Sequence, residues 1–430
     1  MQTTKQNKPF HFKSFILQPI LRNYFVKWLL LCCIVGITSG IAAALFLQSL
    51  NWATNFRNNH LWLIYLLPFS GLIIGFTYFK LGKNVAAGNN ILIATIHEPK
   101  QTVPFKMAPL VYLSTIVTHL FGGSAGREGT ALQMSGAIAD QCSKPFQLTS
   151  TDRKILITAA IAAGFGAVFG TPIAGAIFAN EVAYIKKINY AAIIPSFATA
   201  FIAHEITKLC GVAHTAYPQI LINTYSISTI FYGIIAGIAF GLTATVFSKS
   251  MHTLTDVFKK KIPYAPIRPM IGGLLIVVGV LAVGNTKYNG LGLETINASF
   301  NIALPYYDFA LKILFTVATL SSGFKGGEVT PLFFIGATLG NALSLFIPLP
   351  TNVLAGVGFV AVFAGATNTP IACTIMAMEL MGVHIGGIAL ITCITAYLTA
   401  SKTGIYKSQV FMGSKHHRFT VHPFNRFKNL

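Results

Sequence analysis

Charged residues are scarce in this sequence, and acidic residues are the scarcest of them. Only 10% of the 430 residues are charged, and 11 of these are Asp or Glu. The hydrophobic fraction, by contrast, is 53%. A soluble domain of this length carries more charge and less apolar surface. The composition therefore excludes an ordinary soluble protein and indicates an integral membrane protein.

Cysteine is also rare, and its arrangement excludes further classes of protein. The six cysteines are scattered and contain no CxxC pair, so neither a disulfide framework nor a cysteine zinc motif is present. Cys32, Cys33, Cys373 and Cys393 lie inside apolar runs, as is typical of small buried side chains. We expect no metal site and no cofactor.

Long apolar runs recur along the chain and predict several membrane crossings. They include 28–46, 61–79, 155–177, 227–247 and 385–400. Each run has the length, or nearly the length, that a bilayer core requires. The sequence therefore predicts an all-α polytopic membrane protein.

Basic residues cluster at both ends of the chain and again near its middle, at Lys259, Lys260, Lys261 and Arg268. No acidic residue precedes Glu98, and the tail after residue 400 also contains none. The positive-inside rule then places both termini in the cytoplasm and makes the number of spans even. The net charge of +20 could also suggest nucleic acid, but basic loops facing anionic membrane lipids explain it better.

The sequence contains an internal repeat. GREGTALQMSGA, from Gly126, aligns with GGEVTPLFFIGA, from Gly326. TPIAGAIFANE, ending at Glu181, then aligns with TPIACTIMAME, ending at Glu379. We predict a basic cytoplasmic segment at 1–27, membrane repeats at 28–225 and 226–410, and a basic cytoplasmic tail at 411–430. The symmetry of Glu181 and Glu379 favours a shared packing role.

Glycine clusters interrupt the apolar runs at equivalent places in the two repeats. Each cluster precedes a short apolar run, and the clusters are Gly122, Gly123, Gly126 and Gly129 in the first repeat and Gly323, Gly326, Gly327 and Pro331 in the second. Such segments are typical of half-helices that start inside the membrane. Their unpaired N–H groups and positive dipole ends bind anions, and one from each repeat can point at a common site near the midplane. The pattern alone leaves open whether the repeats are parallel or inverted.

Glu128 places a carboxylate where an anion should bind. It could occupy the site as a tethered anion, then take a proton, become neutral and leave. Burial raises the pKa of such a carboxyl, whereas the helix N-terminus lowers it. A carboxyl balanced between the two effects can titrate, and anion passage could then be coupled to proton movement. Alternatively, Glu128 pairs with Arg127 or caps its helix.

Two enzyme motifs receive little support. GGSAG, at 122–126, matches the GxSxG serine-hydrolase elbow, but that motif needs a preceding strand and distant acid and histidine partners. His204 and Glu205 begin an HExxH pattern, but Lys208 stands at its last position. We expect a protein that is not an enzyme.

These motifs together resemble the CLC family of chloride channels and proton-coupled anion exchangers. GREGT, at 126–130, resembles the family's GREGP, and GEVTP, at 327–331, its GxFxP. GNNIL, at 88–92, stands at the place of GSGIP, and Tyr406 at the place of the central tyrosine. Residues 162–181 resemble a further family segment. The resemblance implies a CLC-type fold: an all-helical homodimer with inverted repeats and one anion pathway in each subunit.

Departures from the chloride pattern resemble the fluoride branch of the family. Thr130 replaces the proline of GREGP, Asn89 replaces the serine of GSGIP, and Val329 stands at a usual phenylalanine position. Val182 stands where chloride exchangers have their internal proton glutamate. The resemblance implies a bacterial inner-membrane fluoride/proton antiporter that protects the cell from fluoride. Its gate and proton carrier would be Glu128.

The candidate anion ligands are donors of three kinds. Asn89 offers an amide; Thr130, Thr330 and Tyr406 offer hydroxyls; and Gly129, Glu328 and Val329 offer backbone N–H groups. Alternatively, Asn89 is a turn residue, Tyr406 an interfacial anchor and Glu328 a helix cap.

Other functions remain open at this point. The transported ion could be chloride, carried by an exchanger or a passive channel of the same fold. A membrane scaffold with a vestigial pore is a further alternative, but Glu128 and Tyr406 count against it.

Overall fold

The computed structural model describes residues 24–185, 188–222 and 226–411. The predicted cytoplasmic segments 1–27 and 411–430 lie almost entirely outside this range. The described residues are helical apart from loops and two strands of two residues each, as the composition predicts.

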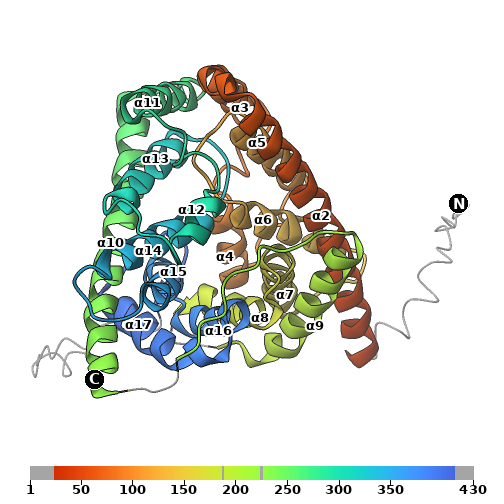
Figure 1. Ribbon diagram of the computed structural model, residues 1–430. Helices are drawn as coiled ribbons and strands as arrows, with labels where there is room; N and C mark the ends of the chain where they lie inside the picture. The colour runs from red at the N-terminus through yellow and green to blue at the C-terminus, as the bar shows by residue number, and fades with distance from the viewer. Residues whose placement is uncertain (1–23, 186–187, 223–225, 412–430) are drawn as a thin grey trace, which may run out of the picture.

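The first half of the chain contains eight α-helices among the described residues (Figure 1). They are α2 (Tyr24–Asn59), α3 (Leu67–Lys80), α4 (Asn89–His97), α5 (Met107–Leu120), α6 (Glu128–Ala139), α7 (Ser150–Phe169), α8 (Pro172–Ala183) and α9 (Tyr190–Leu209). Short 3₁₀ turns η1 (Leu61–Leu66) and η2 (Asp140–Ser143) and strand β1 (Tyr184–Ile185) connect them.

The second half repeats this succession, beginning at Ile227 beside the predicted repeat boundary. Its helices are α10 (Ile227–Lys261), α11 (Ile267–Val283), α12 (Leu293–Ala298), α13 (Asp308–Ser322), α14 (Val329–Leu343), α15 (Thr351–Thr367), α16 (Pro370–Met381) and α17 (Gly386–Thr399). The turn η3 (Val383–Ile385) precedes α17, and strand β2 (Val410–Phe411) ends the described chain. Each half therefore runs from one very long helix to a series of shorter ones.

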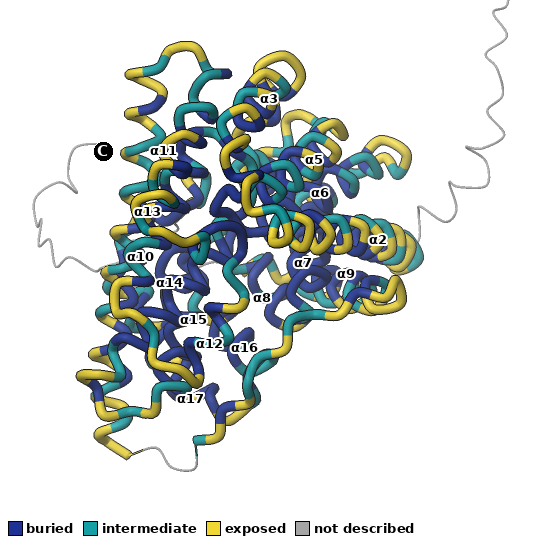
Figure 2. Tube along the Cα trace, turned by 45° about the horizontal axis from the view of Figure 1, so that its top comes forward, coloured by how far each residue is buried: buried dark blue, intermediate teal, exposed yellow. Residues whose placement is uncertain are grey.

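The centre of the molecule is formed by α6 and α7 and their counterparts α14 and α15 (Figures 1 and 2). Almost every residue of α7 from Ile155 to Phe169 is buried, as is every residue of α15 from Val353 to Thr367. A helix that is apolar on all sides belongs in a core. Here α7 and α15 shield the shorter helices α6 and α14 from the surroundings.

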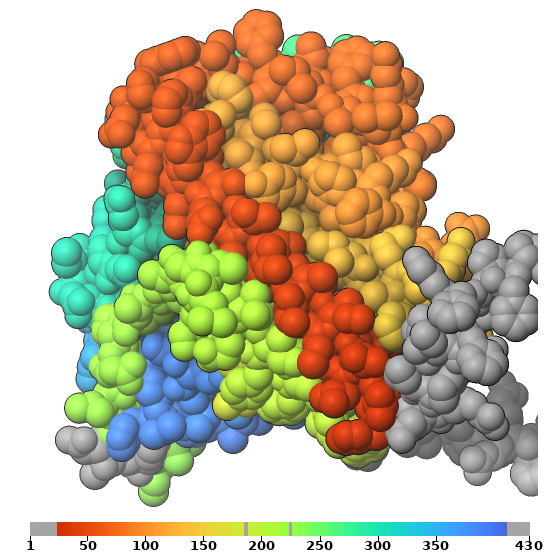
Figure 3. All heavy atoms as spheres, turned by 90° about the vertical axis from the view of Figure 1, so that its right-hand side faces the viewer, coloured from red at the N-terminus to blue at the C-terminus, as the bar shows by residue number. Residues whose placement is uncertain are grey.

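The outermost helices expose large apolar side chains. Examples on α2, α3, α10 and α11 are Leu45, Ile73, Leu242 and Leu281, each more than half exposed. In Figure 3, α2 crosses one face as a continuous diagonal strip, with α9 packed along it. Exposed apolar surface of this extent fits a hydrocarbon environment rather than water.

Only some of the predicted crossings are single helices. Within the described residues, three helical stretches are long and apolar enough to span a bilayer: Tyr24–Asn59, Leu61–Lys80 and Ile227–Lys261. The apolar run at 155–177 is instead two helices, because α7 ends at Gly170 in a left-handed conformation with φ of 76°. Pro172 then starts α8. The run is therefore not one continuous helix, although its length would allow one.

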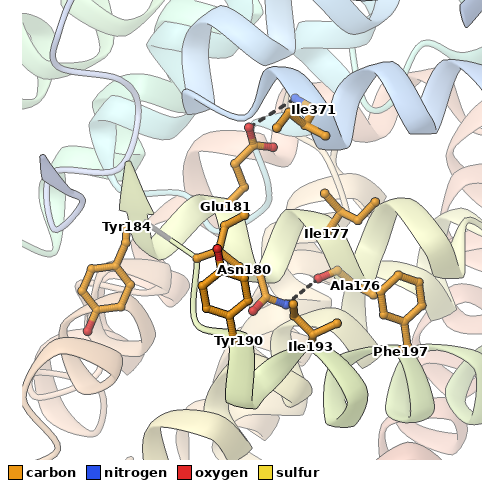
Figure 4. A pocket seen from close by; sticks show the side chains of 10 residues that line it. Ala176, Ile177, Asn180, Glu181, Tyr184, Tyr190, Ile193, Phe197 and Ile371 are labelled. Carbon is orange, nitrogen blue, oxygen red and sulfur yellow. Dashed lines mark hydrogen bonds between the residues drawn. The ribbon is translucent and has the colours of Figure 1, made fainter. Parts of the chain in front are cut away.

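Glu181 and Glu379 cap each other's helices across the two repeats. The carboxylate of Glu181 accepts hydrogen bonds from the N–H groups of Ile371 (3.2 Å) and Ala372 (2.9 Å) at the start of α16, as Figure 4 shows for Ile371. Glu379 accepts from Ile173 (3.0 Å) and Ala174 (2.7 Å) at the start of α8. This confirms the predicted shared packing role. It also shows that the partner of each acid is in the other half.

Removing either cap should destabilise the fold. Each carboxylate satisfies two N–H groups at a helix N-terminus, where negative charge is favourable. We expect Glu181→Ala and Glu379→Ala each to lower the stability by about 1–2 kcal/mol, measured by thermal unfolding in detergent. The control is Glu205→Ala on the exposed side of α9. Losses no larger than the control's would show that the caps do not stabilise the repeat interface.

Candidate anion site

The two glycine loops meet in the middle of the molecule. The N–H of Gly126 donates to the carbonyl of Gly327 (2.6 Å), and the N–H of Gly327 donates to that of Gly126 (2.7 Å). This antiparallel pairing fits repeats of inverted topology. Glycine is required at Gly126, because a Cβ there would lie 2.8 Å from Glu128 Oε2 and 2.9 Å from Pro331 Cδ. The pairing thus brings the starts of α6 and α14 together.

Neither helix start is capped by its own N-cap residue. Arg127 precedes α6 and Glu328 precedes α14, and neither side chain makes a capping hydrogen bond. The first N–H groups of both helices are therefore available to another group. The dipoles of both helices make that position favourable for negative charge.

The side chain of Glu128 takes the donors of α14. Its Oε2 accepts from the backbone N–H of Thr330 (3.1 Å) and of Arg127 (3.1 Å). Its Oε1 accepts from the hydroxyl of Thr330, and Arg127 Nε lies 3.6 Å away. The carboxylate is fully buried. The sequence left open that Glu128 pairs with Arg127 or caps its own helix. In the structure Arg127 is nearby, and Glu128 does cap a helix, but that helix is α14 of the other repeat.

Glu328 occupies the equivalent position but has no equivalent bonds. Its Oε2 is buried without a hydrogen-bond partner among the described residues. It points toward the start of α6, since a Cβ on Gly129 would lie 3.6 Å from that oxygen. The two repeats are therefore asymmetric at this point, with only the acid of the first repeat bonded to the helix of the second.

Asn89 and Tyr406 lie close to the first turns of α6. Asn89 begins α4 directly after Gly88, and its Nδ2 would be 2.9 Å from a Cβ on Gly129. Asn89 and Tyr406 line one small cavity together with Leu92, Ile93, Leu132, Ile161, Phe178 and Val182. Asn89 Oδ1 and Tyr406 Oη are buried without partners in the described part of the chain. Such atoms are rare in folded proteins and call for an explanation.

Residues 407–411, at the end of the described chain, hold Tyr406 in place, and we call this segment the Tyr406 strap. The N–H of Ser408 donates to Asn90 Oδ1 (3.0 Å), and Gln409 Nε2 donates to the carbonyls of Val182 (2.9 Å) and Thr367 (2.6 Å). Val410 and Phe411 then pair in parallel with Tyr184 and Ile185. These contacts bring Tyr406 from the second repeat into the cavity formed mainly by the first.

Most of the predicted anion ligands therefore lie close together in the structure, and Thr130 is the exception. Gly129, Glu328, Val329 and Thr330 lie at the meeting point of α6 and α14 with Glu128, while Asn89 lies beside Gly129. The hydroxyl of Thr130 instead hydrogen-bonds to Thr115 on α5, at 2.7 Å.

Sequence reasoning did not identify Phe178, Gln409 or the backbone N–H of Arg127 as parts of this region. Phe178 stacks on both Phe165 and Phe363, with ring centroids 4.5 Å and 5.7 Å away. No local pattern marks Phe178 as a cavity residue, because its aromatic neighbours come from other helices. The GxSxG alternative lacks its required strand, since α5 precedes the loop and Ser124 bonds to Thr316.

The fold and the site define a polytopic membrane protein that moves anions. Inverted helical repeats deliver two helix N-termini to one buried position, and a carboxylate already occupies the donors there. The family described as "Voltage gated chloride channel" matches residues 70–401. The chain belongs to this family, the CLC family, and to its fluoride branch.

Two relatives of known name illustrate the match. A "Chloride/fluoride channel protein" of Pseudomonas syringae pv. tomato is 48% identical, covering 93% of this chain and 89% of the relative. The "H(+)/Cl(-) exchange transporter ClcA" of Salmonella paratyphi B is 24% identical, covering 87% and 86%.

Solved structures agree on the fold. The crystal structure of a CLC-type fluoride/proton antiporter superposes with a TM-score of 0.86 and 32% identity, covering 94% of this chain and all of the other. A slow cyanobacterial Cl⁻/H⁺ antiporter gives 0.77 at 20% identity, covering 88% and 96%. CLC-type anion transport is therefore the activity of this fold.

Proposed function

We propose that this protein is a proton-coupled fluoride exporter of the bacterial inner membrane, with Glu128 as its gate and proton carrier. The observation that carries the proposal is that the Glu128 carboxylate accepts hydrogen bonds from the N–H and the hydroxyl of Thr330 at the start of α14. It fills the place that a transported anion would take.

Protonation would release the gate. As a carboxylate, Glu128 is held by the positive end of the α14 dipole and by the N–H groups of Thr330 and Arg127. As a neutral carboxyl it loses most of this attraction and can leave. Fluoride then takes the freed donors, so each change of protonation exchanges one anion for the other.

Fluoride in particular needs donors that replace its strongly held water. Thr330 presents both its N–H and its hydroxyl at the site. Tyr406 adds a buried hydroxyl without a partner in the described residues, and Asn89 adds an amide beside Gly129. An anion passing through the cavity would supply the acceptor that the tyrosine hydroxyl lacks.

One carboxylate would have to serve both sides of the membrane. The residues that line the cavity below α6 include no acid, and Val182 stands among them. We infer that Glu128 faces each side in turn, bringing protons inward as fluoride moves outward. Fluoride that accumulates in the cell would be removed by the proton gradient.

The orientation follows from the basic ends of the chain. Lys27 at the start of α2 bonds to Asp152 at the start of α7 (2.7 Å), so both helix starts lie at one face. We assign this face to the cytoplasm, with both termini on it. The resemblance of the sequence to the CLC family implies a homodimer with one pathway per subunit.

A chloride/proton exchanger or a passive anion channel is the second candidate. The name "Chloride/fluoride channel protein" of the 48% identical relative favours it. In a channel, the same glutamate would open the path without carrying protons.

Flux from liposomes separates these functions. Purified protein is reconstituted, and fluoride, chloride and pH electrodes record efflux in one cell. We expect fluoride to leave at least about tenfold faster than chloride, with protons moving the opposite way. Comparable chloride flux would indicate the chloride exchanger, and fast flux without proton movement would indicate a channel.

A further inference from the structure

One face of α4 leads from the anion site to the edge of the protein. Asn89, Ile93 and His97 are spaced four residues apart and therefore lie on one side of this helix. Asn89 and Ile93 line the cavity that contains Tyr406. With a rise of about 1.5 Å per residue, His97 lies roughly 12 Å from Asn89 along the helix axis.

His97 is held by the same segments that form the cavity. Its ring lies edge-on against Tyr184, with centroids 4.5 Å apart, and the hydroxyl of Tyr184 donates to the carbonyl of Ile96 (3.3 Å). Backbone groups of Ser408 and Ala183 lie next to the imidazole. These residues directly follow the Tyr406 strap and Val182. His97 therefore lies beside segments of both repeats, next to residues that follow Val182 and Tyr406 in the chain.

The Nε2 atom of His97 is the nitrogen to which we assign proton transfer. Nε2 is buried and has no hydrogen-bond partner among the described residues. Beyond His97 the chain reaches solution, where Glu98 and Lys100 form an exposed ion pair at 2.6 Å. The other charged or titratable groups near the ring are Lys154 on α7 and Tyr184 on β1. Imidazole is the side chain best suited to exchange protons near neutral pH.

We propose that His97 transfers protons between the cavity and the cytoplasm. This inference rests on the proposed fluoride/proton exchange. When protonated Glu128 faces the cavity, its O–H bond breaks and the proton passes through water to Nε2 of His97. The imidazolium then releases its proton to the cytoplasm, and Glu128 is again an anion. The cavity admits a water-sized sphere over about 10 Å³, roughly the room for one water. Further waters would have to enter to cover the roughly 12 Å along α4.

The test uses two variants and one matched control. All variants keep Glu128. His97→Gln retains a polar side chain at position 97, but glutamine cannot carry a proton. His97→Ala opens space for an added base. His60→Gln removes a histidine at the far end of α2, where the ring stacks on Phe56. Fluoride and proton fluxes are recorded from liposomes between about pH 5.5 and pH 8, with and without imidazole.

We expect His97→Gln to lower coupled fluoride turnover about tenfold or more and to flatten its pH dependence, with the proton-to-fluoride ratio unchanged. Imidazole should restore much of the rate of His97→Ala. His60→Gln should behave as the unmodified protein. A pH profile of unchanged shape, together with no response to imidazole, would overturn the role of His97. Absence of proton movement in the unmodified protein would instead overturn the proposed exchange itself.

Discussion

Glu128→Gln should abolish proton movement and lower fluoride turnover by about a hundredfold or more. Glutamine has nearly the shape of glutamate but carries no charge, so it corresponds to the protonated gate, which the start of α14 no longer holds. It can neither take up nor release a proton under working conditions. The gate would therefore stay in one state, and the alternation between carboxylate and fluoride that turnover requires would stop.

The measurement is fluoride and proton flux from liposomes at equal protein density. Glu205→Gln is the control, since this carboxylate is 58% exposed on α9 and far from the cavity residues. It should leave both fluxes unchanged. Normal fluoride turnover by Glu128→Gln, with protons still moving, would contradict the proposed mechanism.

Asn89→Ser combined with Thr130→Pro should reduce the preference for fluoride over chloride by about tenfold. The double change restores the residues found in the chloride-selective pattern. Asn89 presents its amide beside Gly129 at the start of α6, and serine would withdraw that donor. A site with fewer donors compensates less well for the hydration that fluoride loses.

The structure predicts unequal effects of the two single substitutions. The hydroxyl of Thr130 bonds to Thr115 rather than facing the cavity, so Asn89→Ser should account for most of the change. The ratio of fluoride to chloride efflux is measured for both single variants and for the double variant. An unchanged ratio in all three would place selectivity elsewhere, for example at Phe178 in the cavity wall.

The sequence contained enough information to predict the repeat, the half-helices and the residues at their starts. These features are local, because a glycine cluster followed by a short apolar run identifies a helix start without knowledge of its neighbours. The resemblance to the CLC family supplied the inverted fold, which the repeat alone did not decide.

Contacts between the repeats could not be predicted in the same way. No local pattern tells which N–H groups the Glu128 carboxylate reaches, since Thr330 lies in the other half of the chain. The exchange of caps between Glu181 and Glu379 is hidden for the same reason. The break at Gly170 was missed because a left-handed glycine ends a helix without interrupting the apolar run.

The most direct test of proton-coupled fluoride export is transport against a gradient. Liposomes containing the protein are given equal fluoride on both sides and a pH difference across the membrane. Internal and external fluoride are then followed with an electrode. Fluoride should leave the more alkaline compartment and accumulate on the acidic side until its gradient balances that of the protons. Fluoride that stays equal on both sides, although the protein carries it rapidly down a gradient, would contradict the coupling and indicate a channel.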